Sequence, residues 1–267
     1  HNHASQPGNT APWTYADRMA MADGIAECDK AKENVKTKCG DIKKKAKCPS
    51  SAAITRAEKA RKAAKDTHGL NSRQYNTQNA KVTAEYKAYA KAVQSDPCQR
   101  ALRCFLSPYK PSRCCPKQTP HHVVDAASFT DGPAFPGQPR SKHPKKTGWK
   151  KYSVNKAPCV CAEGPNQTTA SHGLMHVRTG VVAQAKQKNG EWTRKQATDT
   201  GVKAMTKTFP GTKACEACLK KQLDKYHDSA RTTPDDKPIN ANVEMTADPT
   251  ARTAAAKVML PPPRRRR

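Results

Sequence analysis

Three short blocks of sequence between residues 118 and 176 decide the fold of this chain: Gln118-Thr-Pro-His-His-Val-Val124, Ala157-Pro-Cys-Val-Cys161 and Ser171-His-Gly-Leu-Met-His176. Four of the nine histidines stand in them, two as neighbours and two at a spacing of four residues. The third block is expected to form a helix that begins at Ser171 as its cap. The histidines in this part of the chain are therefore expected to form a functional site.

The spacing of these histidines indicates two roles. Residues four apart on a helix lie on one face, so His172 and His176 can offer two imidazole nitrogens to a single cation. Neighbours on a strand point to opposite sides, so His121 and His122 are not expected to reach the same atom. One of them can bind a metal while the other, neutral near pH 7, takes a proton from water.

The composition is strongly basic, with 49 lysines and arginines against 22 acidic residues and a formal charge of +27. Such an excess indicates a polyanionic partner, most often nucleic acid, although solubility or an acidic protein partner would also explain it. With 35% hydrophobic and 5% aromatic residues, the chain can bury one modest core, or a core plus a small helical subdomain. No apolar run approaches membrane-spanning length, and a first residue other than Met predicts a fragment.

Taken together, the three blocks resemble the Gly-His-His type toxin nucleases of the HNH/endonuclease VII superfamily. More narrowly, they resemble the toxin domain that follows PAAR-like spike-tip domains in type VI secretion effectors. The resemblance covers residues 110–228 well and implies a ββα-metal unit, in which two strands and a helix complete one divalent-metal site. Pro120 stands where the family has glycine, so the turn into the strand must be built differently.

The resemblance assigns roles to the four histidines. His121 matches the first metal ligand, and His172 and His176 match the two ligands on the helix. His122 matches the general base that deprotonates the attacking water. The cofactor implied is one divalent ion, which can be Mg, Mn, Ni or Zn.

A third catalytic residue is expected to be an asparagine that braces the strands and orients the base. Asn166 is the best match in this sequence, and Asn155 is the possible substitute. The segment from Phe129 to Lys156, rich in Pro, Gly and Lys, is interpreted as an insertion into the minimal unit.

Contacts to phosphate are expected from basic side chains near the three blocks. The predicted set is Lys117, Lys145, Lys146, Lys150, Lys151 and Arg178. A helix between Thr193 and Lys207 also has one basic side, which is equally typical of a solvated surface. Contacts to phosphates carry no base information, so no sequence specificity is expected.

Eleven cysteines require a choice between zinc and disulfides. The spacing Cys215-x-x-Cys218 is that of zinc ligands, but no second pair of this kind completes a four-cysteine site. Scattered single cysteines with one left over favour several disulfides and a free thiol. The cysteines assigned a structural role are Cys98, Cys104, Cys114, Cys115, Cys159, Cys161, Cys215 and Cys218.

Four regions are predicted along the chain. Residues 1–14 are expected to be loop-like and to end an upstream PAAR-like domain or linker, and 15–108 to form a helical subdomain. In that subdomain, residues 15–47 predict one long helix interrupted at Gly40, followed by a basic helix from Ser51 and a helix over 72–94. Residues 109–230 are expected to form the nuclease core with flanking helices. Residues 231–267 predict an extended Pro/Arg-rich tail whose final arginines add affinity for phosphate.

The sequence therefore predicts an α+β fold, mostly helical and cysteine-rich, around a ββα-metal core. By resemblance, the function is a metal-dependent DNA endonuclease that acts as an antibacterial toxin. It would be delivered by a type VI secretion system into the cytoplasm of a target bacterium and be neutralised by an acidic immunity protein. An RNase of the same fold and a non-catalytic basic nucleic-acid-binding module are the alternatives.

Overall fold

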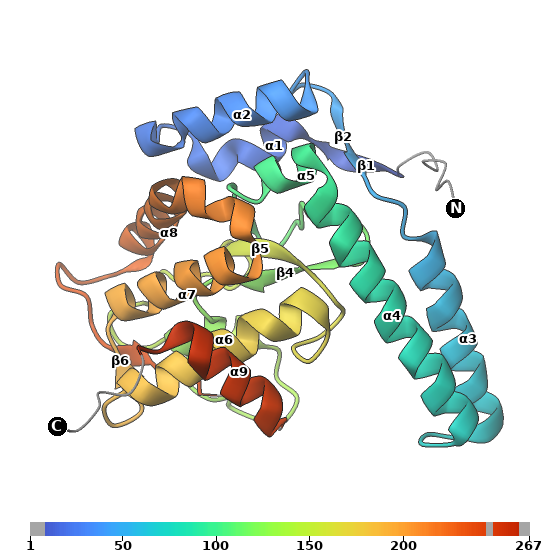
Figure 1. The fold of residues 1–267 in the computed structure, drawn as a ribbon. Coiled ribbons are helices and arrows are strands. Elements are labelled where there is room, and N and C mark those ends of the chain that lie inside the picture. Colours follow the sequence, from blue (N-terminus) through green and yellow to red (C-terminus); the bar gives the residue numbers. More distant parts are fainter. Residues whose placement is uncertain (1–8, 244–247, 262–267) are drawn as a thin grey trace, which may run out of the picture.

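A small antiparallel sheet lies among helices near the middle of the protein (Figure 1). The computed structural model describes residues 9–243 and 248–261. The sheet has the order β3-β5-β4, formed by Ser107–Pro108, Pro158–Glu163 and Gln118–His122. Every residue of the central strand β5 is buried, as its apolar sequence requires. In the part of the chain described, no helix is both long and apolar enough to span a membrane.

Strand β4 lies at the edge of this sheet, and its register fixes where the two neighbouring histidines stand. His121 lies opposite Val160 and His122 opposite Cys159. Pro120 lies opposite Cys161 in the same ladder. An edge strand tolerates proline because one of its sides needs no hydrogen bonds, which explains how Pro120 fits without the glycine of the family.

Helix α6, Ala170–Lys186, follows β5 and completes the ββα arrangement. The helix begins one residue before Ser171, the expected cap, and Thr169 takes the N-cap position. Ser171 instead accepts a hydrogen bond of 2.7 Å from the backbone N–H of Glu163, which ties the helix to the end of β5. Gly173 lies within the first turns of the helix. A Cβ at this position would stand 2.7 Å from the carbonyl carbon of Thr168, so only glycine fits there without a shift of the backbone.

The N-terminal part differs from the prediction. Residues 9–14 are not loop but form strand β1, Asn9–Thr14, which pairs with β2, Lys45–Cys48. The single long helix expected over residues 15–47 is also wrong. The chain forms several short elements there: α1 Tyr15–Met19, the 3-10 turns Ala20–Ala22 and Ala26–Cys28, α2 Asp29–Cys39 and then β2.

Glycines at positive φ set the breaks in this region. Gly24 has φ of 72°, and Gly40, at 82°, ends α2 where the interruption was expected. The lysine-rich composition favours helix, but pairing with β1 holds Lys45–Cys48 as a strand.

Helices α3, Ala52–His68, and α4, Arg73–Ser95, form a hairpin that extends from the rest of the protein (Figure 1). Helix α3 begins one residue after the predicted start at Ser51, and α4 agrees within one residue with the predicted range 72–94; Ser72 caps α4 through its side chain. An apolar stripe of α4 is buried in a small cluster with α3. Its members are Ile54, Val82, Tyr86, Tyr89 and Val93. Helix α5, Pro97–Leu102, then leads back to the sheet.

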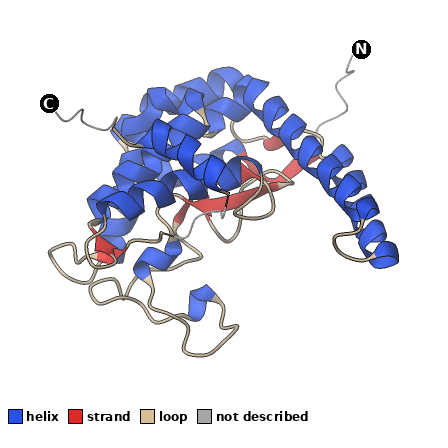
Figure 2. Cartoon of the chain, turned by 60° about the horizontal axis from the view of Figure 1, so that its bottom comes forward, coloured by secondary structure: helices blue, strands red, loops and turns tan. Residues whose placement is uncertain are grey.

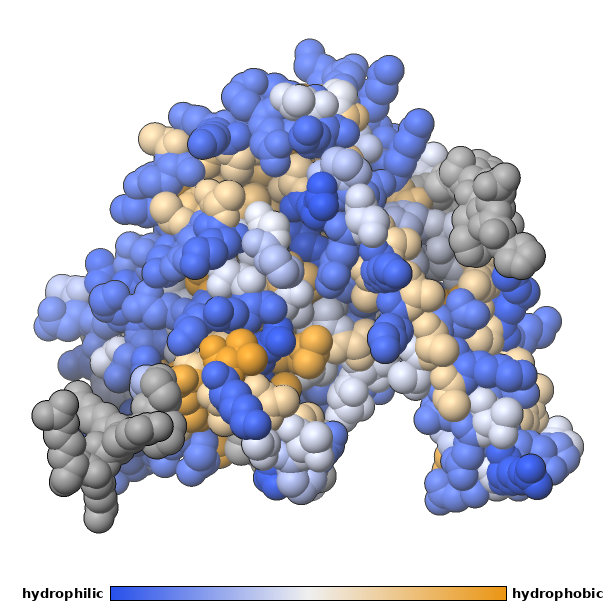
Figure 3. All heavy atoms as spheres, in the orientation of Figure 1, coloured by the Kyte–Doolittle hydropathy of each residue, from blue (hydrophilic) through white to orange (hydrophobic). Residues whose placement is uncertain are grey.

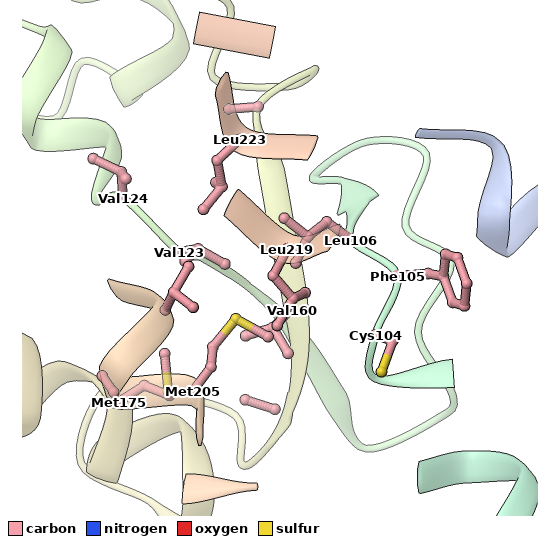
Figure 4. Packing of buried hydrophobic residues seen from close by; sticks show 14 of the residues in the cluster. Cys104, Phe105, Leu106, Val123, Val124, Val160, Met175, Met205, Leu219 and Leu223 are labelled. Carbon is pink, nitrogen blue, oxygen red and sulfur yellow. The ribbon is translucent and has the colours of Figure 1, made fainter. Parts of the chain in front are cut away.

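The main core lies where the sheet meets the C-terminal helices. These helices are α7, Arg194–Thr208, and α8, Glu216–Ala230, with the 3-10 turn Pro210–Cys215 between them. Figure 4 shows side chains of the sheet, α6, α7 and α8 meeting in this core. The labelled residues include Val123, Val160, Met175, Met205, Leu219 and Leu223.

The segment after residue 231 is not the extended tail that was expected. It contains strand β7, Ile239–Asn240, which pairs with β6, Glu191–Trp192, and helix α9, Pro249–Met259. Helix α9 lies against α6 and buries Ala255 and Met259. The final arginines, 264–267, lie outside the described residues.

The interpreted insertion, residues 129–156, contains little regular structure beyond the 3-10 turn Arg140–Lys142 (Figure 2). It is nevertheless anchored, because Trp149 and Tyr152 are buried against Phe129 at the end of the 3-10 turn Ala126–Phe129. The rings of Phe129 and Tyr152 stack with centroids 4.3 Å apart. The ring of His227 in α8 also stacks on the ring of Phe129. His227 is buried in this aromatic cluster, so it is a structural histidine.

Five disulfides join segments far apart in sequence, which confirms the preference for disulfides over zinc. The pairs are Cys28–Cys218, Cys39–Cys98, Cys48–Cys115, Cys104–Cys215 and Cys114–Cys161. The cysteine left over is Cys159, which is buried in β5. Both members of the Cys-x-x-Cys spacing are thus bonded to other segments and not to a metal.

Candidate metal centre

Three histidines meet where β4 passes the first turns of α6. His121 comes from the strand, and His172 and His176 come from one face of the helix. One ring nitrogen from each lies within 4.8 Å of the other two. The Nε2 atoms of His172 and His176 are 3.2 Å apart. Three imidazoles at these distances can bind one ion; the spacing predicted the pair His172 and His176, and the resemblance added His121.

Burial favours the neutral form of two of these histidines, His121 and His172. Burial lowers the pKa of His121 well below its usual value, and positive charge on His176 or His172 would lower it further. Burial, with a smaller contribution from His176, lowers the pKa of His172 to about 4. Neutral imidazole is the form that binds metal, so His121 and His172 can bind a divalent ion without releasing protons at neutral pH.

His122 faces a different environment from its neighbour. Its ring stacks on Tyr109 with centroids 4.9 Å apart. Its Nε2 lies 2.9 Å from the carbonyl oxygen of Val154. A carbonyl only accepts, so Nε2 carries the hydrogen and Nδ1 keeps its lone pair. Burial lowers the pKa of His122, while the Val154 carbonyl and Asp125 act in the opposite direction. This imidazole is therefore oriented as a proton acceptor.

All four histidines line one pocket of about 340 Å³. The pocket lies at the end of β4, so the two neighbouring histidines both border it although they point to different sides. Its wall also carries Lys110 and Arg140, which sequence reasoning missed. Both come from irregular segments that only tertiary folding brings to the site, so no pattern in the sequence marks them.

The two candidate asparagines lie in different places. Asn166 is exposed between β5 and α6, where its Oδ1 accepts hydrogen bonds from Thr168 and Thr169. It therefore organises its own loop. Asn155, the substitute, lies on the wall of the histidine pocket. The structure brings Asn155, and not Asn166, to the histidines.

Most side chains expected to contact phosphate have partners within the protein. Lys117 forms an ion pair with Glu58, and Lys146 forms one with Glu191. Lys145 donates to the carbonyls of Ser141 and His143, and Arg178 donates to Thr208. Lys150 and Lys151 are exposed on the surface.

The basic side predicted for α7 is also occupied. Arg194 forms ion pairs with Asp224 and Asp236, and Lys203 donates to the carbonyl of Met259 at the end of α9. This side of α7 therefore binds other parts of the same chain.

A buried carboxylate joins the three elements of the site. Glu163, at the end of β5, is fully buried and pairs with Arg103 after α5. It also accepts a hydrogen bond of 3.1 Å from Gln118 at the start of β4, and one from the hydroxyl of Ser171 next to His172. One side chain thus fixes β4, β5 and α6 relative to one another. Sequence reasoning missed it because a single Glu in an apolar strand carries no recognisable pattern.

Two antiparallel strands and a helix that bring three histidines to one point, with a fourth oriented as a base, define a ββα-metal unit. Residues 118–227 match a family described as GHH signature containing HNH/Endo VII superfamily nuclease toxin 2. The matched residues include the three histidines of the cluster.

A curated relative is similar to nearly the whole chain. The DNase toxin Tse7 of Pseudomonas aeruginosa is 34% identical over 275 aligned residues, which cover 96% of this chain. The chain spans 64% of the length of that relative. No solved structure matches the chain.

Proposed function

We propose that this protein is a metal-dependent endonuclease that hydrolyses phosphodiester bonds of DNA. One observation carries the proposal: His121, His172 and His176 gather around one point in the pocket that also contains His122. The metal set and the base are thus supplied by one strand and one helix. A basic module that only binds nucleic acid has no need for such an arrangement.

The bound ion would act as a Lewis acid on the scissile phosphate and stabilise the leaving oxygen. His122 would accept the proton of the attacking water at Nδ1, because its Nε2–H is held by the Val154 carbonyl. Lys110 and Arg140 on the pocket wall would neutralise the entering phosphate. Asn155 borders the same pocket and would donate a hydrogen bond to substrate or water, whereas the role assigned by resemblance to Asn166 is to brace the strands and orient the base.

The ligand set favours some divalent ions over others. Imidazole nitrogens suit Zn, Ni and related transition metals, whereas Mg prefers oxygen ligands. The cluster consists of three histidines. We therefore expect transition ions to bind more tightly than Mg, with water or phosphate oxygens completing the coordination.

The biological role proposed is that of an antibacterial toxin. The name of the relative and the description of the family support both toxicity and DNA as substrate. We propose delivery by a type VI secretion system, from an upstream PAAR-like domain, into the cytoplasm of the target bacterium. A charge of +27 favours an acidic immunity protein as the neutralising partner.

The proposal is tested with supercoiled plasmid, with and without EDTA and with Mg, Mn, Ni or Zn added. The variants are His122→Ala and, as a matched control, His68→Ala, which changes an exposed histidine at the end of α3. Wild type and the control should nick the plasmid, and EDTA should stop them. His122→Ala should be slower by roughly 100- to 10,000-fold, the range for loss of a general base.

The outcomes separate the alternatives. No cleavage of plasmid by wild type with any ion would contradict the proposal and leave a binding module. Cleavage of single-stranded RNA but not of plasmid would replace DNase with RNase. Equal cleavage by His122→Ala would remove His122 from the role of base.

A further inference from the structure

The α3–α4 hairpin contributes little to the main core. Helix α4 has 23 residues, so it is about 35 Å long. The hairpin buries its own small cluster around Ile54 and Tyr86, separate from the cluster that fills the rest of the protein. Its far end extends beyond the other elements (Figures 1 and 3). Stability of the main core therefore does not explain why this long hairpin is present.

The base of the hairpin is fixed next to the metal centre. The hydroxyl of Tyr89 donates to the carbonyl of Pro116 at 2.8 Å, and Glu58 pairs with Lys117. These two residues directly precede β4, which carries His121. Ala170 packs against the hairpin cluster at the start of α6, two residues before His172. The hairpin is thus held in a fixed position relative to both elements that supply the histidines.

The hairpin is strongly basic. Residues 52–95 contain nine lysines and arginines against three acidic residues. Two of those acidic side chains pair with Lys117 and Lys62. Besides Lys62, seven basic side chains are exposed along the two helices: Arg56, Lys59, Lys65, Arg73, Lys81, Lys87 and Lys91. The positive charge lies on the surface and continues along most of the hairpin.

The position of the hairpin suits a long, charged ligand. Figure 2 shows the hairpin on one side of the small sheet and the irregular segments on the other. The latter include residues 139–141, which line the histidine pocket. In Figure 3 a hollow separates the hairpin from the rest of the protein. A ligand that enters the pocket and continues beyond it on the side of the hairpin would meet these basic side chains.

We propose that the α3–α4 hairpin is a docking arm that binds the phosphate backbone of duplex DNA beside the cleavage site. The proposal rests on the proposed nuclease function and specifies how that site holds its substrate. Binding is by charge and not by base stacking, because Tyr86 and Tyr89 are buried. The arm increases the affinity for duplex of any sequence and takes no part in the chemistry.

The test compares two variants of equal charge change in the full chain. The arm variant changes Lys59, Lys65, Lys87 and Lys91 to Gln. The control variant changes Lys30, Lys38, Lys43 and Lys44 to Gln, exposed lysines in and after α2 at the top of Figure 1. Binding to a 30-base-pair duplex is measured in EDTA over a range of salt concentrations. Plasmid cleavage is measured separately with metal.

The arm variant should bind duplex roughly 10- to 100-fold more weakly than the control variant near 0.1 M salt. The slope of log affinity against log salt should become shallower by up to about 3.6, corresponding to four lost phosphate contacts. Cleavage at saturating protein should be unchanged, because the metal centre is intact. Equal affinity of the two variants for duplex would overturn the proposal.

Polyglutamate serves as a second probe. If the arm substitutions weaken binding to polyglutamate more than binding to duplex, the hairpin is a surface for an acidic protein and the proposal is wrong. Failure of the nuclease function is a distinct result, because wild type would then bind duplex and cleave no plasmid.

Discussion

At the scale of single residues, Glu163 is the buried charge on which the histidine site depends. Its carboxylate pairs with Arg103, which is itself buried, and accepts from Gln118 and Ser171. Removing one partner of a buried pair leaves the other charge without compensation. Glu163→Ala should therefore lower the free energy of unfolding by about 3–5 kcal/mol, measured by urea denaturation.

A matched control is Glu191→Ala, because Glu191 pairs with Lys146 at the surface and its side chain is 43% exposed. Exposed pairs contribute at most about 1 kcal/mol. A loss for Glu163→Ala no larger than that of the control would show that Glu163 does not hold the three elements together.

The two asparagines give a second prediction at this scale. Asn155→Ala should slow DNA cleavage by roughly 100-fold, the effect of removing one preoriented hydrogen-bond donor. Asn166→Ala should leave the rate nearly unchanged, because its side chain bonds only within the loop before α6 as far as the described contacts extend. Initial rates of plasmid nicking measure both. The opposite ranking would restore the role that resemblance gives to Asn166.

Site residues could be predicted from the sequence where their spacing along the chain fixes their positions on a helix or strand. The spacing of four residues was enough to place His172 and His176 on one helix face, and the resemblance was needed to choose His121 over His122 as the third candidate ligand. Glu163, Lys110 and Arg140 were not predictable in this way, since their contacts come from tertiary folding. Lys117 and Lys146 were predicted to bind phosphate but form internal ion pairs. Charge in the sequence does not reveal an acidic partner that lies far away along the chain.

At the scale of elements, the crossing of α7 over the end of β4 is a point of close approach. A Cβ on Gly201 would lie 2.3 Å from the carbonyl oxygen of Val123, the residue after His122. Gly201→Ala should lower the free energy of unfolding by about 1–3 kcal/mol, because the helix must move away from the strand. In the middle of a helix, alanine would otherwise stabilise by up to about 1 kcal/mol.

The control for this crossing is Gly132→Ala, since nothing lies within 4 Å of a Cβ at Gly132. Its effect should stay within about 0.5 kcal/mol, as for an ordinary surface position. Urea denaturation measures both variants. A Gly201→Ala protein as stable as the control would mean that the close contact is not maintained.

The predicted elements were right where a local pattern agrees with the packing. The stripe of α4 and the cap at Ser72 are local, so the bounds of the helix followed from the sequence. The predictions for residues 15–47 and for the segment after residue 231 were both wrong because these elements depend on tertiary contacts. Strand β2 exists because it pairs with β1, and α9 buries Met259 against other helices. Both depend on partners that no local window contains.

At the scale of the whole molecule, disulfides connect the N-terminal half to the C-terminal half, which carries two of the three clustered histidines. Cys28–Cys218 spans 190 residues and Cys104–Cys215 spans 111. The main core likewise includes residues from Ala11 to Met259. The number of cysteines predicted disulfides with one thiol left over, but the pairing was not predictable, because spacing along the chain does not encode which cysteines meet in space.

The last prediction concerns this network. Without reductant, the native protein should show no reactive thiol, because Cys159 is fully buried and the other ten cysteines are paired. Unfolding in urea should expose one thiol per chain, and reduction should expose all eleven. Titration with a thiol reagent gives the three values. Cys159→Ser provides the control, since unfolding it without reductant should expose none.

Reduction should also destabilise the protein, since a native disulfide typically contributes about 2–5 kcal/mol. The free energy of unfolding and the rate of plasmid cleavage should both fall in dithiothreitol. The distance between the histidines depends on β5, which Cys114–Cys161 joins to the segment before β4. Two or more thiols on unfolding without reductant would show that at least one of the five bonds is missing in solution. Undiminished stability after complete reduction would show that packing alone holds the site.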